Sequence, residues 1–128
     1  MNGKKYELLQ DQTIEWRGRT LYRICALRDF WSVHAGDVGG YIECERNLSQ
    51  DGNAWVSDDA RVCGDAWVCD NALVCDDARV YGDAWVCDNA WVCGDALVYG
   101  DAWVCGNALV CGNARVSDDA RVYGDADG

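Results

Sequence analysis

The sequence predicts an all-β protein in which a small N-terminal β meander precedes a long stack of very short strands. An alanine falls at every sixth residue from Ala54 to Ala126, thirteen in all and without a gap. A valine follows two residues after the alanine twelve times, from Val56 to Val122. The two residues before each alanine are drawn from Gly, Asp and Asn, which are typical of turns. Together these observations indicate short strands joined by corners.

The first element is the meander, which we expect over residues 1–50. The stretches YELL, TIEW and RTLYRICAL alternate as strands do, and Arg17-Gly18 is placed to turn the chain before the last of them. The stretch from Val33 to Ser49 then leads into the stack. Within it, we expect the run Gly36-Asp37-Val38-Gly39-Gly40 to form a tight turn rather than an anion-binding nest. The meander should cap the upper end of the stack, where backbone groups would otherwise lack partners.

The second element is the stack itself, which we expect over residues 51–128. Its unit is [GD]-[DN]-A-x-V-x. The spacing A-x-V places alanine and valine on the same side of a strand, and the preceding pair tolerates left-handed or turn conformations. One such unit cannot bury its apolar side alone, whereas stacked units can.

The V-x-x-x-A-x pattern over residues 52–126 resembles the hexapeptide repeat of left-handed parallel β-helix proteins, a family that includes many trimeric acyltransferases. The N-terminal part is similar to that of hexapeptide proteins encoded by bacteria, phages and prophages, most of which have no assigned activity. The resemblance implies a left-handed helix of about four triangular coils, about eighteen residues each, and a homotrimer.

A coil of this length sorts the outward side chains onto three faces. The residues between alanine and valine then form ladders of Trp55, Leu73, Trp91 and Leu109; of Arg61, Arg79, Leu97 and Arg115; and of Trp67, Trp85, Trp103 and Arg121. The residues after valine form ladders of Ser57, Cys75, Cys93 and Cys111; of Cys63, Tyr81, Tyr99 and Ser117; and of Cys69, Cys87, Cys105 and Tyr123. Two faces are therefore rich in Trp, Leu and Cys, and one is rich in Arg and Tyr.

Charge and cysteine content restrict the classes of function. The net charge is −11, and residues 51–128 supply the excess with four Arg against fifteen Asp. A chain this acidic is not expected to bind nucleic acid polymers. We expect no membrane span, because no run of eighteen apolar residues occurs, and the first residues lack the apolar core of a signal peptide. The odd number of cysteines, nine, favours free thiols in the cytoplasm of a bacterium or of an infected host cell.

We expect the tryptophan-bearing faces to pack in a homotrimer, because they form a large apolar surface. The preferred function is a non-catalytic module that holds a small anionic or nucleotide-like ligand in clefts between subunits. With the resemblance to phage proteins, this becomes sequestration of a nucleotide signal of bacterial immunity. The candidate contacts are Trp67, Trp85 and Trp103 for stacking, Arg61, Arg79 and Arg115 for charge, and Tyr81 and Tyr99 for hydroxyl groups.

Two alternatives stay open. A long and nearly perfect repeat also suits a purely structural or assembly scaffold. An acyltransferase would use His34, the only histidine, although the family places its catalytic histidine on a coil. We expect no catalytic residue and no cofactor in the repeat.

We also expect no metal site, because the cysteines are six residues apart and form no C-x2-C pair. Corner geometry accounts for the polar ladders, in which asparagine side chains can bond from coil to coil. At the lower end, Asp125 and Asp127 are expected to guard against end-to-end stacking. The polar ladders are Asn53, Asn71, Asn89 and Asn107; Asp59, Asp77 and Asp95; and Asp65, Asp83, Asp101 and Asp119.

Overall fold

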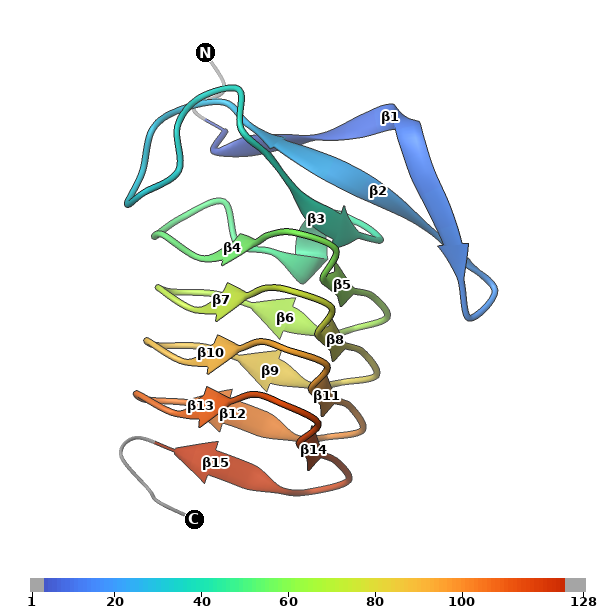
Figure 1. Cartoon of the computed structure of the whole chain (residues 1–128), viewed down its shortest axis with the longest axis vertical. Coiled ribbons are helices and arrows are strands. Elements are labelled where there is room, and N and C mark those ends of the chain that lie inside the picture. The colour runs from blue at the N-terminus through green and yellow to red at the C-terminus, as the bar shows by residue number, and fades with distance from the viewer. Residues whose placement is uncertain (1–3, 124–128) are drawn as a thin grey trace.

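The computed structural model describes residues 4–123 of the chain, so Asp125 and Asp127 lie outside the described residues. Figure 1 shows a column of stacked coils with a β hairpin crossing its upper end and hanging down beside the upper coils. The protein is all-β, and the one helical turn among residues 4–123 is a 3₁₀ turn, η1 (Glu45–Asn47). No helix in this part of the chain is long and apolar enough to cross a membrane.

The head is an antiparallel meander of three strands, but the predicted strands YELL and TIEW form one long strand, and the third strand lies in the segment expected to lead into the stack. Strand β1 (Tyr6–Trp16) pairs with β2 (Arg19–Ala26), and β2 pairs with β3 (Val38–Ile42). Arg17 and Gly18 turn the chain between β1 and β2 with φ of 54° and 75°. Positive φ at both central residues is typical of the tight hairpin turns that match the twist of the flanking strands.

Twelve short strands form the column. They are β4 (Trp55–Val56), β5 (Arg61–Val62), β6 (Trp67–Val68), β7 (Leu73–Val74), β8 (Arg79–Val80), β9 (Trp85–Val86), β10 (Trp91–Val92), β11 (Leu97–Val98), β12 (Trp103–Cys105), β13 (Leu109–Val110), β14 (Arg115–Val116) and β15 (Arg121–Tyr123). Each pairs in parallel with the strand three elements later, as in Trp55 with Leu73 and Trp67 with Trp85. The eighteen-residue coil and the three predicted ladders of residues between alanine and valine are therefore confirmed.

The column begins above the repeat. Strand β3 pairs in parallel with β5 through Tyr41 and Arg61, and Leu48 forms a parallel bridge to Val68. Residues 38–48 therefore add a layer to the four coils of the repeat. Strand β3 also joins the hairpin to one face of the column, in a sheet of order β1-β2-β3-β5-β8-β11-β14. The other two faces are the sheets β4-β7-β10-β13 and β6-β9-β12-β15.

Alanine and valine fill the interior. All alanines from Ala54 to Ala102 and all valines from Val56 to Val104 of the repeat have no exposed surface. Backbone hydrogen bonds join each coil to the next, as from Arg61 N–H to Ala78 O at 3.0 Å. The column is therefore a dry stack whose rungs repeat the same contacts.

The corners have the left-handed backbone that their composition predicts. Gly64 and Gly82 have φ of 71° and 72°, and Asp70 and Asp88 take the equivalent position with φ of 62° and 59°. The asparagine ladder bonds from coil to coil, with Asn71 Nδ2 donating to Asn89 Oδ1 at 3.2 Å. The corner interpretation of these residues is confirmed.

The head closes the upper end of the column with buried side chains. The Lys5 ammonium is fully buried and donates to the Ala54 carbonyl at 2.6 Å, and burial lowers the Lys5 pKa to about 8. Trp55 lies beneath the head, with ring centroids 6.4 Å from Tyr6 and 5.3 Å from Phe30. Trp55 lies in its predicted ladder, but only 3% of it is exposed, so the expected exposure of this side chain is wrong. The head covers Trp55, whereas Trp91 in the same ladder is 42% exposed.

The glycine-rich run of the head contains a turn and a strand. Asp37 N–H donates to His34 O at 2.8 Å, and Gly36 has φ of 94°, so a tight turn lies at residues 34–37 and not over the whole run. Gly39 and Gly40 lie in β3, directly against the first coil. A Cβ atom on Gly39 would lie 2.5 Å from Val56 O, which explains why a residue without a side chain stands there.

Candidate ligand cleft

An indole from the hairpin packs on the upper part of the Arg/Tyr face. Trp16, at the end of β1, makes an edge contact with Tyr81, and the two ring centroids are 5.3 Å apart. The guanidinium groups of Arg17, Arg61 and Arg79 lie 5.6, 5.7 and 5.5 Å from the Trp16 ring centroid. We call these residues the Trp16 cluster. It exists because β3 joins the hairpin to the sheet that carries the arginine ladder.

The three arginines of the Trp16 cluster carry positive charge that no carboxylate offsets. Within residues 4–123, none of Arg17, Arg61 and Arg79 forms an ion pair. The Nε atom of Arg79 is buried and has no hydrogen-bond partner in the same part of the chain. Stacking on an aromatic ring stabilises a guanidinium only modestly, and a buried donor without an acceptor is costly. The cluster therefore concentrates positive charge and leaves one buried donor unsatisfied.

A cleft of about 420 Å³ opens beside the Trp16 cluster. The hairpin turn forms one wall with Arg17 and Arg19. The column forms the other wall with the corners of two successive coils. The residues on that second wall are Cys63, Gly64, Asp65, Tyr81, Gly82 and Asp83. The backbone ladder fixes the strands and corners that form this second wall.

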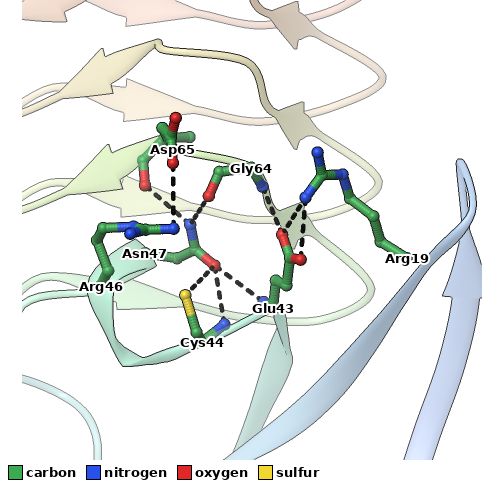
Figure 2. A network of polar contacts seen from close by, with 8 residues as sticks. Arg19, Glu43, Cys44, Arg46, Asn47, Gly64 and Asp65 are labelled. Atoms are coloured by element: carbon green, nitrogen blue, oxygen red, sulfur yellow. Dashed lines mark hydrogen bonds and ion pairs between the residues drawn. The ribbon is translucent and has the colours of Figure 1, made fainter.

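A polar network fixes the upper rim of the cleft, as Figure 2 shows. The Glu43 carboxylate accepts two hydrogen bonds of 2.9 Å from Arg19 Nη1 and one of 2.8 Å from Gly64 N–H. Arg46 forms an ion pair of 3.1 Å with Asp65. The charge of Arg19 is therefore balanced by Glu43, and that of Asp65 by Arg46. Arg17 is left as the cation of the hairpin wall.

Asn47 anchors this rim from inside. It is fully buried, and its Oδ1 atom accepts hydrogen bonds from Glu43 N–H at 2.9 Å and Cys44 N–H at 3.0 Å. Its Nδ2 atom donates to Gly64 O at 3.1 Å and Ala66 O at 2.9 Å. One amide thus ties the segment after β3 to the first corner of the cleft (Figure 2).

The column wall of the cleft provides hydrogen-bond acceptors. Asp83 lies between Asp65 and Asp101 in its ladder. Loss of hydration and these two neighbouring carboxylates raise the Asp83 pKa above its ordinary value. Tyr81 stacks on Tyr99 with centroids 5.1 Å apart and an interplanar angle of 5°. The cleft thus places guanidinium groups on the hairpin wall, and a tyrosine ring with two carboxylates on the column wall.

The predicted contact residues fall on two separate surfaces of one chain. Arg61, Arg79, Tyr81 and Tyr99 lie at or beside the Trp16 cluster, and Arg115 is exposed further down the same sheet. The tryptophan ladder lies on a different sheet, where Trp85 contacts Trp67 and Trp103 at centroid distances of 5.1 Å. A site that combines both sets requires a second copy of the chain.

Sequence reasoning missed Arg17, which lines the cleft, and Trp16, which packs on Tyr81 beside it. The only signal for them was the turn at Arg17-Gly18, which fixes the tip of the hairpin but not where it lies. His34, the candidate catalytic residue, does not line the cleft. It lies in a loop with 73% of its side chain exposed, and its Nδ1 atom is 4.0 Å from Asp29 Oδ2. The structure places no other described titratable group of the chain in an ion pair with it.

Part of the repeat matches a known family. Residues 72–88, 90–106 and 114–126 match the family model described as the YdcK β-solenoid repeat. These segments cover three stretches of the column and agree with its parallel stacked coils. No curated protein matches the chain.

Proposed function

We propose that the chain is a non-catalytic binding module in which a β-solenoid presents a cleft for a small anionic ligand of the nucleotide class. The observation that carries the proposal is the Trp16 cluster, where three arginines surround one indole without a carboxylate partner. The protein as a whole has a net charge of −11, so this gathering of positive charge is local and specific. Guanidinium groups bind phosphate with paired, charge-assisted hydrogen bonds.

The two walls of the cleft suit the two ends of a nucleotide. Its phosphate groups would lie toward Arg17 on the hairpin wall, beside the part of the Trp16 cluster that holds Arg61 and Arg79. Hydroxyl or amino groups of its sugar or base would donate to Asp83 on the opposite wall. The cleft volume of about 420 Å³ lies within the range of small-molecule sites. In an infected bacterium, such a module would act by sequestering a nucleotide signal of host immunity.

We propose further that the module is a homotrimer in the cytoplasm. Trp67 and Trp85 are each 37% exposed, Trp91 is 42% exposed and Leu109 is 60% exposed, which supports packing of these side chains against another copy. All nine cysteines are free, which supports a reducing compartment. Native mass spectrometry of gently purified protein measures the number of chains and any retained ligand together.

The binding test compares arginines of one ladder. We expect isothermal titration with mono-, di- and cyclic nucleotides to detect at least one ligand, and Arg79→Gln to weaken its binding about 10-fold or more, since a charge-assisted bond contributes about 1.5–3 kcal/mol. Arg115→Gln is the matched control, because Arg115 lies on the same sheet as Arg79, two coils below it, and is exposed. Absence of binding by every nucleotide, or equal weakening by both variants, would refute the proposed cleft.

A structural scaffold is the second candidate function. The chain is a β-solenoid, and its backbone ladder continues without interruption from β3 to the last strands. That continuity supports a rigid spacer that holds the head at a fixed distance from a partner. A trimer that retains no ligand and binds no nucleotide would favour this function over the binding module.

A further inference from the structure

Three groups of thiols and carboxylates recur along the column, away from the ligand cleft. They are Cys69, Asp70 and Cys87; Cys87, Asp88 and Cys105; and Cys75, Asp76 and Cys93. Within each group, one sulfur or oxygen atom per residue lies within 4.8 Å of the other two. The first two groups share Cys87, so they form a continuous ladder of three sulfurs and two carboxylates.

The geometry of each group follows from the coil. A cysteine and an aspartate are neighbours at the start of a corner, and the second cysteine comes eighteen residues later, one coil below. Asp70 and Asp88 have left-handed φ of 62° and 59°, which turn their side chains along the stack. The sulfurs of each group come from different coils, so the groups do not appear in the sequence as closely spaced cysteine pairs.

Backbone N–H groups of the coil below hold the carboxylates beside the thiols. Asp70 Oδ2 accepts a hydrogen bond from Asp88 N–H at 3.2 Å, and Asp88 Oδ2 accepts one from Gly106 N–H at 3.0 Å. Asp76 Oδ2 accepts one from Gly94 N–H at 3.0 Å. Cys69 Sγ also donates to Asp70 Oδ2 at 3.8 Å. Outer hydrogen bonds of this kind orient ligands in metal sites.

We propose that these groups bind thiophilic divalent cations of the Zn²⁺ and Cd²⁺ class. Each ion would take two thiolate sulfurs and one carboxylate oxygen, and the Cys87 thiolate would bridge two ions. Filling all three groups would therefore release five thiol protons to solvent, one from each cysteine. Sulfur donors select such cations over Mg²⁺ and Ca²⁺, which prefer oxygen. A fourth position is left for water. Zn–S bonds of about 2.3 Å require the two sulfurs to approach to about 3.8 Å, which side-chain rotation can provide.

The proposal differs from our sequence-based expectation of no metal site, and it does not depend on the ligand cleft. It makes a sharp distinction between cysteines of one ladder. Cys93 and Cys111 also stack at a separation of eighteen residues, but Gly94 follows Cys93 where the three groups have an aspartate. Cys111 belongs to none of the groups found among the described residues. This pair is the matched control for the role of the carboxylate.

The experiment is a titration of the reduced protein with Cd²⁺ without oxygen, followed by the thiolate-to-cadmium charge-transfer absorption. Cys87→Ser removes a shared ligand of two groups, so we expect the saturating absorption to fall by about two thirds. Cys93→Ser removes a ligand of one group, and we expect a fall of about one third. Cys111→Ser should leave the absorption unchanged.

A second pair of variants preserves all the thiols. Asp88→Asn keeps a side-chain oxygen as an acceptor for Gly106 N–H but removes the charge, and we expect it to weaken Cd²⁺ binding at least 5-fold at its own group. Asp95→Asn is the control, because Asp95 follows a glycine in an equivalent corner. The proposal is overturned if wild-type protein shows no charge-transfer absorption, if Cys111→Ser lowers it as much as Cys93→Ser, or if the two aspartate variants behave alike. The aspartate pair decides the question even if Cys87→Ser fails to fold, as circular dichroism would reveal.

Discussion

Replacing Trp55 with alanine tests whether the head and the column form one structural unit. Trp55 and Trp91 occupy the same ladder two coils apart and belong to the same kind of repeat. Trp55 is only 3% exposed, because Tyr6 and Phe30 cover it, whereas Trp91 is 42% exposed. The two substitutions are therefore equivalent in the sequence and unequal in the structure.

The expected difference follows from buried area and ring contacts. With about 250 Å² for a buried indole and about 25 cal/mol per Å², the extra burial of Trp55 corresponds to about 2.5 kcal/mol. Trp55 also makes two edge contacts with aromatic rings, against one for Trp91 with Trp31, and each contributes about 0.5–1.5 kcal/mol. We expect Trp55→Ala to lower the free energy of unfolding by about 3 kcal/mol more than Trp91→Ala.

The assay is urea unfolding followed by far-ultraviolet circular dichroism. Several protein concentrations separate the unfolding of a chain from the dissociation of an oligomer, which would involve Trp91 if its face is an interface. Equal losses, within about 1 kcal/mol, would refute the assignment of Trp55 to a shared core of head and column.

Three further predictions concern single positions. Gly82→Ala should destabilise the protein by about 1–2 kcal/mol or more, because φ is 72° and the new Cβ would lie 2.9 Å from Gly100 N. Gly82→Asp should cost less, since its carboxylate can accept a hydrogen bond from Gly100 N–H. Equal melting temperatures of the two variants would contradict this reasoning. Asn47→Ala should cost about 3 kcal/mol or more in chemical denaturation, since four buried or part-buried backbone groups lose their hydrogen bonds, and a loss below about 1 kcal/mol would argue against the anchor. Folding lowers the pKa of Lys5 from 10.5 to about 8, so between pH 8 and 10.5 the unfolded chain binds more protons at Lys5 than the folded chain does. The unfolding free energy of wild type relative to Lys5→Met should therefore rise from pH 8 to 10.5, by about 3 kcal/mol, and a flat or falling difference would show that the amine is not buried in the folded state.

The column could be predicted residue by residue from the sequence. Alanine and valine at a constant spacing define which side chains point inward, and identical coils can stack in only one favourable register. Trp67 therefore lies above Trp85, and Arg61 above Arg79, as the period requires. Local chemistry and tertiary structure agree throughout this part of the chain.

The cleft could not be predicted, because it depends on contacts between distant and dissimilar segments. The turn at Arg17-Gly18 indicates a hairpin, but no periodicity tells which face the hairpin meets. That choice is made by β3, which pairs with β2 on one side and with β5 on the other. The burial of Trp55 depends in the same way on Phe30 in a loop of the head.

The eighteen-residue coil gives the column a unit of permitted length change. Loss or gain of eighteen residues, as recombination between near-identical repeats would produce, keeps every ladder on its own face and only shortens or lengthens the column. Loss of six residues keeps the alanine and valine rungs intact but moves every lower strand to the next face, so arginines would follow below tryptophans. Such a chain could still fold, since its interior is unchanged, yet its surfaces would be scrambled. Variation in length is therefore tolerated by the core in steps of six and by the surfaces only in steps of eighteen.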